Sequence, residues 1–219
     1  MDATVTVELG AEDAHLEIPW QSGDLRYYDL KRHPELLLEL PESHNREMAE
    51  FLTAMNSALS MLETAKCDTW LSDKMEEQES MYAARWKFCC YVDLIFTDPK
   101  ARHGFTSHEN FAKRIARLLR RAPDIPSVAE FIVRRCRYAS DAAGAAAQPG
   151  SNSQANEGFY LTFYLSGYGD DEDEARGRWG IGLKVVENAL LQLSAMHRRG
   201  SDQTEPPPAE TLRALGDAG

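Results

Sequence analysis

Long apolar runs are missing from this sequence of 219 residues. No window approaches the roughly 18 consecutive apolar residues that a membrane-spanning helix requires. The opening residues, MDATVTVELGAED, also lack the basic start and the apolar core of a secretory signal peptide. We therefore expect a cytoplasmic protein that makes no use of a membrane.

Cysteine is scarce, with four residues in the chain and no CxxC spacing between any two of them. Paired spacings of that kind would indicate a disulfide framework or a zinc site. Neighbouring residues on a strand point to opposite faces, so Cys89 and Cys90 should not bond to each other. We interpret all four cysteines as small apolar side chains inside the fold.

Recognisable catalytic motifs are absent as well. The sequence has no GxSxG nucleophile elbow and no HExxH metal motif. Asp93 is the acid of most interest, because it lies in a strand pattern with Arg85, Lys87 and Tyr91. We interpret it as a member of an exposed cross-strand ion pair. The sequence therefore predicts no catalytic residue and no cofactor, and it favours a non-enzymatic protein.

Basic residues are outnumbered, 24 Lys and Arg against 35 Asp and Glu, which gives a net charge of −11. This acidity argues against a protein devoted to nucleic acid. The basic residues are nevertheless concentrated between Glu109 and Tyr138, where eight of them meet three acidic ones. The charge distribution is therefore strongly uneven.

The patterns that are present predict an α+β fold. Alternating apolar and polar residues predict strands, and a 3.6-residue period predicts helices. Strands are expected at 61–71, 85–97 and 157–168, a short hairpin at 4–9 and 15–20, and helices at 34–40, 43–62, 106–121, 127–139 and 183–199. Half-exposed alternating strands are typical of antiparallel sheets. We predict a single largely antiparallel sheet of about five strands with helices packed mainly on one face.

The domain prediction is one α+β domain over residues 1–200. Residues 140–156 are rich in Ala, Ser, Gly and Asn, which indicates a flexible insert. Residues 201–219, with three consecutive prolines, are predicted to be a disordered tail.

The stretch from Gly169 to Gly182 suggests an anion site, because it reads as a loop that leads into a helix. Unpaired N–H groups and the helix dipole attract anions at such a point. The candidate ligand-binding residues are Arg135, Arg176, Arg178, Gly180, Gly182 and Lys184. The five acids at 170–174 would repel a phosphate, and Asp170, Asp171 and Asp173 are weak candidates for a divalent cation instead.

Two further surfaces are candidates for interaction. Tyr160, Tyr164 and Tyr168 share one face of the last strand, which could line a ligand cleft or form a subunit interface. We favour the interface, because tyrosine is enriched at protein interfaces. Arg114, Arg117 and Arg121 lie on the polar face of the helix predicted at 106–121. These residues could meet an acidic protein or a second copy of the chain.

Three functional hypotheses follow from the sequence. The leading one is a protein-interaction module that binds a protein partner or self-associates, for example as a homodimer. The first alternative is an enzyme or receptor for a small anionic ligand held between the 169–182 loop and the sheet. The second is nucleic-acid binding through the basic helices at 106–138, although the acidity of the chain argues against nucleic acid as a partner.

Overall fold

The computed structural model describes residues 1–10, 16–139 and 156–202. The predicted insert at 140–156 and the predicted tail at 201–219 fall almost entirely outside these residues.

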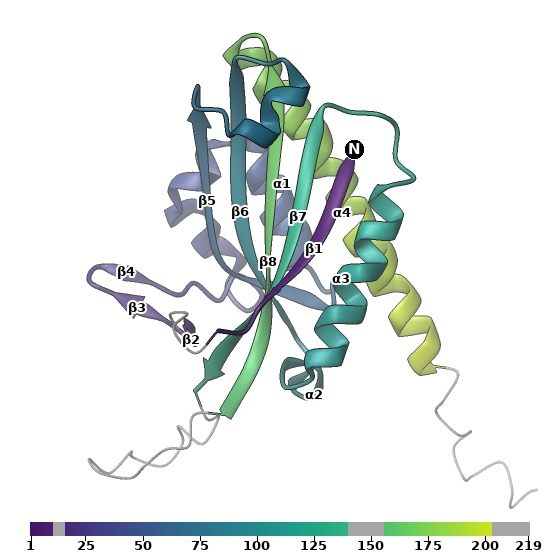
Figure 1. The fold of residues 1–219 in the computed structure, drawn as a ribbon. Coiled ribbons are helices and arrows are strands. Elements are labelled where there is room, and N and C mark those ends of the chain that lie inside the picture. Colours follow the sequence, from purple (N-terminus) through teal and green to yellow (C-terminus); the bar gives the residue numbers. More distant parts are fainter. Residues whose placement is uncertain (11–15, 140–155, 203–219) are drawn as a thin grey trace, which may run out of the picture.

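The described residues form a mixed sheet with the strand order β1-β7-β8-β6-β5 (Figure 1). Its strands are β1 (Asp2–Glu8), β2 (Leu16–Ile18), β5 (Leu62–Ser72), β6 (Trp86–Phe96), β7 (Ser127–Tyr138) and β8 (Asn156–Gly169). The pairs β5–β6, β6–β8 and β7–β8 are antiparallel. The predicted α+β class and the largely antiparallel sheet are confirmed, as are the strands expected at 61–71, 85–97 and 157–168.

The N-terminal hairpin prediction is wrong. β1 and β2 do not pair with each other, because both run parallel to β7, along Val128–Arg134 and Cys136–Tyr138 respectively. Alternation in a sequence identifies a strand without naming its neighbour. Ala3 and Val5 of β1 instead complete the apolar core beside β7, which lies more than a hundred residues away in the chain.

The helix predicted at 127–139 is also wrong, because these residues form strand β7. Ala129, Phe131 and Val133 are fully buried on one face, which is a period of two. The twelve residues of β7 pair with β8 along their whole length. Ser127, the first residue of the predicted helix, caps no helix, since its hydroxyl has no hydrogen-bond partner in the described residues.

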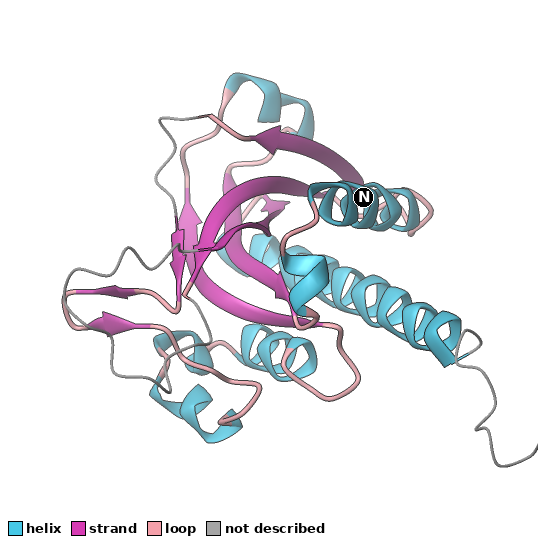
Figure 2. Ribbon diagram, turned by 90° about the horizontal axis from the view of Figure 1, so that it is seen from below, coloured by secondary structure: helices cyan, strands magenta, loops and turns pink. Residues whose placement is uncertain are grey.

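Three helices cover one face of the sheet, namely α1 (Arg46–Met55), α3 (Phe105–Leu119) and α4 (Glu172–Asp202). The short α2 (Pro99–Arg102) precedes α3, and η1 (Pro34–Glu39), η2 (Pro41–His44) and η3 (Glu77–Tyr82) are 3₁₀ helices. Figure 2 shows the strands curving over the long α4, with the hairpin of β3 (Gln21–Ser22) and β4 (Leu25–Arg26) on the opposite side. No helix in the described ranges is long and apolar enough to cross a membrane.

Glycine allows α4 to lie directly on the central strand. A Cβ atom at Gly167 of β8 would stand 2.3 Å from the backbone nitrogen of Trp179, so only glycine fits there. The close approach buries Trp179 completely, with its ring edge-on to Phe88 at 4.7 Å between centroids. This contact joins α4 to both β8 and β6 in the main core.

The opposite face of the sheet carries polar and aromatic side chains, and it is covered at its two ends. At one end η3 lies over β8, where Tyr82 stacks on Tyr168 and Glu79 accepts a hydrogen bond of 2.8 Å from the Tyr168 hydroxyl. At the other end a second apolar cluster includes Ile18 and Tyr160. We call this side the polar face, and the candidate site lies on it.

Candidate functional site

The predicted 169–182 loop is instead the first third of α4, which begins at Glu172. Asp171 accepts a hydrogen bond from the backbone N–H of Glu174 at 2.8 Å, and the Glu174 carboxylate accepts one from the N–H of Asp170 at 2.7 Å. Asp171 thus caps the start of the helix in the manner of an N-cap residue, and the acidic charge also suits the positive end of the helix dipole. The acidic run therefore starts a helix, and the described residues contain no metal-binding cluster of three or more His, Cys, Asp or Glu.

The candidate anion-binding residues do not converge at a helix start. Gly180 and Gly182 lie within α4, and Gly182 faces Ser127 and Leu165 of the sheet, as expected for close helix–sheet packing. Arg176, Gly180 and Lys184 share a surface hollow of about 440 Å³ with two carboxylates, those of Glu47 and Asp173.

The basic candidates have structural partners of their own. Arg178 donates to the backbone oxygen of Tyr168 at 2.6 Å, and Lys184 donates to Glu187 at 2.6 Å. Arg135 lies on β7, with its Nε atom 3.6 Å from a carboxylate oxygen of Glu157. Five of the six candidates thus lie on α4, three of them around one hollow, and Arg135 lies on β7.

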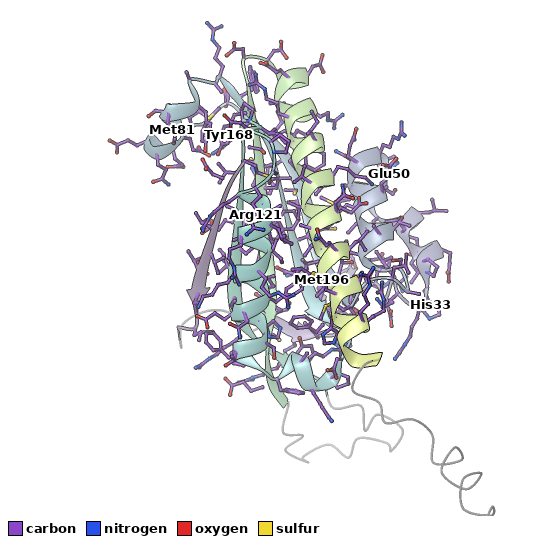
Figure 3. All side chains as sticks on the ribbon, turned by 90° about the vertical axis from the view of Figure 1, so that its right-hand side faces the viewer. His33, Glu50, Met81, Arg121, Tyr168 and Met196 are labelled. Carbon is purple, nitrogen blue, oxygen red and sulfur yellow. The ribbon has the colours of Figure 1, made fainter. Side chains whose placement is uncertain are left out.

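The two predicted interaction surfaces lie on different parts of the molecule. Arg114, Arg117 and Arg121 are exposed on or just after α3, whereas the tyrosines lie on the polar face of β8. Figure 3 shows Arg121 beside α3 and Tyr168 close to Met81 of η3. Tyr160 and Tyr168 are only 6% and 3% exposed, so of the three tyrosines only Tyr164 is half-open.

A cavity of about 470 Å³ lies on the polar face, above the middle of the sheet. Its lining side chains come from four strands and from the segment 16–22. They are Lys66 of β5, Tyr91 and Asp93 of β6, Arg134 of β7, Tyr160 and Tyr164 of β8, and Leu16, Glu17, Pro19, Trp20, Gln21 and Ser22.

Asp93 lines this cavity and is buried without an ion pair in the described residues, which is unusual for a carboxylate. Its side chain is buried, at 5% exposure, and its one hydrogen bond in the described residues comes from the hydroxyl of Thr162 at 2.7 Å. Sheet register places Lys66 on one side of Asp93 and Thr162 on the other. Burial raises the pKa of Asp93 to about 6, and the Thr162 hydrogen bond, Arg134 and Lys66 oppose the rise.

The cations of the cavity rest against aromatic rings. The Lys66 ammonium lies 4.7 Å from the centroid of the Trp20 ring, and the Arg134 guanidinium lies 5.9 Å from that of Tyr164. Trp20 is fixed in turn, because its indole N–H donates to the backbone oxygen of Ala65 at 2.7 Å. Arg134 also pairs with Glu8 at 2.8 Å. Because Lys66 lies against Trp20 and Arg134 pairs with Glu8, neither cation forms an ion pair with Asp93.

A second cavity, of about 560 Å³, continues from the first beneath the β3–β4 hairpin. The two share Trp20, Ser22, Lys66 and Tyr91, so the Lys66–Trp20 contact stands between them. The second cavity is lined further by the carboxylates of Glu39, Glu42 and Asp68 and by Tyr28, Leu30, Leu40, Pro41 and Arg26, among others. We call the two cavities together the sheet cleft.

Part of this site could be found in the sequence. Alternation places Asp93 and Tyr91 together on β6, and Tyr160 with Tyr164 on β8. Lys66, Trp20 and Arg134 were missed, because strand pairing and the fold of the segment 16–44 bring them to Asp93. Alternation in β5 could have placed Lys66 on a sheet face. The position of Arg134 on the sheet could not be predicted, because the pattern of β7 predicts a helix.

The sheet cleft can hold a molecule of small-metabolite size against aromatic walls, with a carboxyl group that can accept or donate a proton. Comparison of the chain with protein-family models, with curated proteins and with solved structures finds no match. The case for a function therefore depends on the geometry of this cleft.

Proposed function

We propose that this is a cytoplasmic protein that binds a small ligand in the sheet cleft, where Asp93 hydrogen-bonds to the ligand and exchanges a proton with it. The observation that carries the proposal is a buried carboxyl group on the wall of a cavity with a single hydrogen bond and no ion pair in the described residues. Buried carboxylates with a purely structural role are normally paired. A ligand in the cavity would supply the missing partner.

The surroundings of Asp93 support a binding site. Trp20, Tyr91 and Tyr164 are half-buried, so their rings offer contact area and polar tips to a ligand. All four cysteines carry free thiols, which fits the reducing cytosol.

The test is a screen of small molecules by thermal shift and by NMR on the full chain, with Asp93→Asn and Asp73→Asn as matched variants. Asp73 is exposed and makes no ion pair in the described part of the chain. Its substitution therefore removes one negative charge, as Asp93→Asn does, but at a position outside the cleft. We expect ligands that shift the resonances of Tyr91 and Tyr164, with weaker binding by Asp93→Asn alone. A broad screen in which no compound perturbs these tyrosines would contradict the proposal.

Self-association is a second candidate, and the edge strand β5 favours it. β5 is an edge strand of the described sheet. Side chains of Lys31 and Trp20 donate to its backbone oxygens at Leu62 and Ala65, but Trp70 and Leu71 farther along the strand are 38% and 37% exposed. Such an edge is a template for another strand. Light scattering over a range of concentrations tests this candidate. Dimers that Trp70→Lys abolishes would support it, and a monomer at all concentrations would refute it.

The nucleic-acid hypothesis loses its structural premise. Residues 127–138 form a strand inside the sheet, so the pair of basic helices on which it relied does not exist.

A further inference from the structure

We infer that the ligand of the sheet cleft is an organic amine, with an ammonium group held by Glu42 and Asp68 in the second cavity. This inference rests on the proposed function and reverses the charge of the ligand that the sequence suggested. Three independent features of the cleft lead to it.

The first feature is the balance of charge. The side chains that line the two cavities include five carboxylates, those of Glu17, Glu39, Glu42, Asp68 and Asp93, and three cations, those of Arg26, Lys66 and Arg134. The whole chain has a net charge of −11, which attracts cations from a distance. An anionic ligand would enter a cleft of its own sign.

The second feature is that most of these carboxylates lack a counter-ion. Glu39 pairs with Arg26 at 3.1 Å, but Glu17, Glu42, Asp68 and Asp93 form no ion pair within the described ranges. Burial raises the pKa of Glu42, and the nearby charge of Asp68 raises it further. The half-buried Glu42 and the exposed Asp68 line one cavity and form no ion pair in the described residues, so an ammonium group beside them would relieve their repulsion.

The third feature is that the aromatic walls already hold cations. Of the five cation–π contacts in the described residues, three line the cleft, namely Arg26 on Tyr28, Lys66 on Trp20 and Arg134 on Tyr164. Ligand cations bind to such rings by the same electrostatic attraction. The protein's own side chains thus show which charge these walls accept.

The arrangement also indicates the shape of the ligand. Glu42 and Asp68 line only the second cavity, and Asp93 lines only the first. Trp20 and Tyr91 line both and offer apolar surface between them. A ligand with polar groups at both ends of an apolar chain would satisfy both sets of carboxylates.

The experiment compares three probes that share a chain of five carbons but differ in charge: cadaverine, pentanediol and glutarate. Titration calorimetry and NMR on the full chain measure affinity and location at neutral pH. We expect cadaverine to perturb Trp20 and Tyr91, and pentanediol to bind roughly tenfold more weakly, which corresponds to about 1.4 kcal/mol. Glutarate should bind more weakly still.

Variants assign the ammonium site. Glu42→Gln and Asp68→Asn keep the side-chain shape and remove one charge each. Each should lower the affinity for cadaverine several-fold, whereas Asp73→Asn should leave that affinity unchanged. Equal or tighter binding of pentanediol or glutarate in the cleft would overturn the amine assignment while the proposed function stood. Cadaverine binding that neither variant weakens would overturn the assignment too. The proposed function itself fails separately, if no compound of any charge perturbs the cleft.

Discussion

Replacing Asp93 with asparagine should stabilise the protein at neutral pH. Asparagine has nearly the same shape, and its oxygen can still accept the hydrogen bond from Thr162. The variant removes only the ionisation of a buried group, whose charged form burial disfavours. The change should therefore raise the free energy of unfolding, although the group belongs to the proposed ligand site.

The size of the effect follows from the pKa of Asp93, which lies at about 6 in the folded protein against an ordinary value of 3.8. Each pH unit between the two values corresponds to about 1.4 kcal/mol, so the folded state loses up to about 3 kcal/mol when Asp93 ionises. Water that enters the cavity would solvate the carboxylate and lower this destabilisation, so we expect a difference of about 1–3 kcal/mol between the two proteins. For a chain of this length, 1 kcal/mol corresponds to roughly 2–4 °C in the melting temperature.

The sign of the pH dependence is fixed by the direction of the pKa change. Below pH 3.8 both states of the wild type hold the proton, so the variant has no advantage. Between 3.8 and about 6 the folded state binds more protons than the unfolded state, and the wild type loses stability as pH rises. Above about 6 the full difference is present.

Urea unfolding of both proteins, followed by tryptophan fluorescence at several pH values from about 4 to 8, measures this difference directly. Asp73→Asn provides the control, and its stability should follow that of the wild type at every pH. An Asp93→Asn variant that is less stable than the wild type near pH 8, or whose advantage does not vary with pH, would refute the reasoning.

Two more predictions concern packing and anchoring. Gly167→Ala should lower the free energy of unfolding by about 1–3 kcal/mol in urea unfolding, because its Cβ atom would meet the backbone of Trp179 at 2.3 Å. Gly177→Ala, also involving α4 but with open space around the new atom, should raise it by about 0.5–1 kcal/mol, and a similar loss in both variants would contradict the packing argument. Lys31→Met should cost about 1.5–3 kcal/mol in melting experiments, because the ammonium donates to the backbone oxygens of Ser57, Ser60 and Leu62 at 2.8–3.1 Å. The exposed Arg32→Met should cost less than about 1 kcal/mol, and equal costs would show that the Lys31 contacts contribute little.

The sequence predicts the middle of the sheet better than its edge. Strands β5, β6 and β8 alternate without competing patterns, so their position and the face of Tyr164 could be predicted. The expected exposed ion pair of Asp93 is wrong, because its side chain is 5% exposed and forms no ion pair in the described residues. In β7 the apolar residues Val128, Phe131 and Ile132 match a helical period, while Ala129, Phe131 and Val133 match a strand. Pairing with β8 decides between the two, and local sequence does not contain that information.

The start of α4 was missed for a different reason. Gly177, Gly180 and Gly182 each lower helix propensity, by about 1 kcal/mol relative to alanine, so the region resembles a loop. Burial of Trp179 and Leu183 against the sheet outweighs that cost. The local signal that a helix begins earlier was Asp171, whose carboxylate caps the N–H of Glu174, and the acidic run concealed it.

The position of β8 in the chain has a consequence for biosynthesis. β8 lies at the centre of the sheet, yet among the described strands it is the last to be made, and α4, which covers it, follows. During translation β1 is made long before β7, with which it pairs in the described sheet. The hairpin of β5 and β6 likewise has one edge unpaired until β8 is made. Such distant pairings make folding slow and leave apolar strands unprotected on the nascent chain. A ribosome-bound chain that stops before residue 156 should therefore be protease-sensitive and a substrate for chaperones, whereas one extended beyond residue 202 should acquire resistance in a single step.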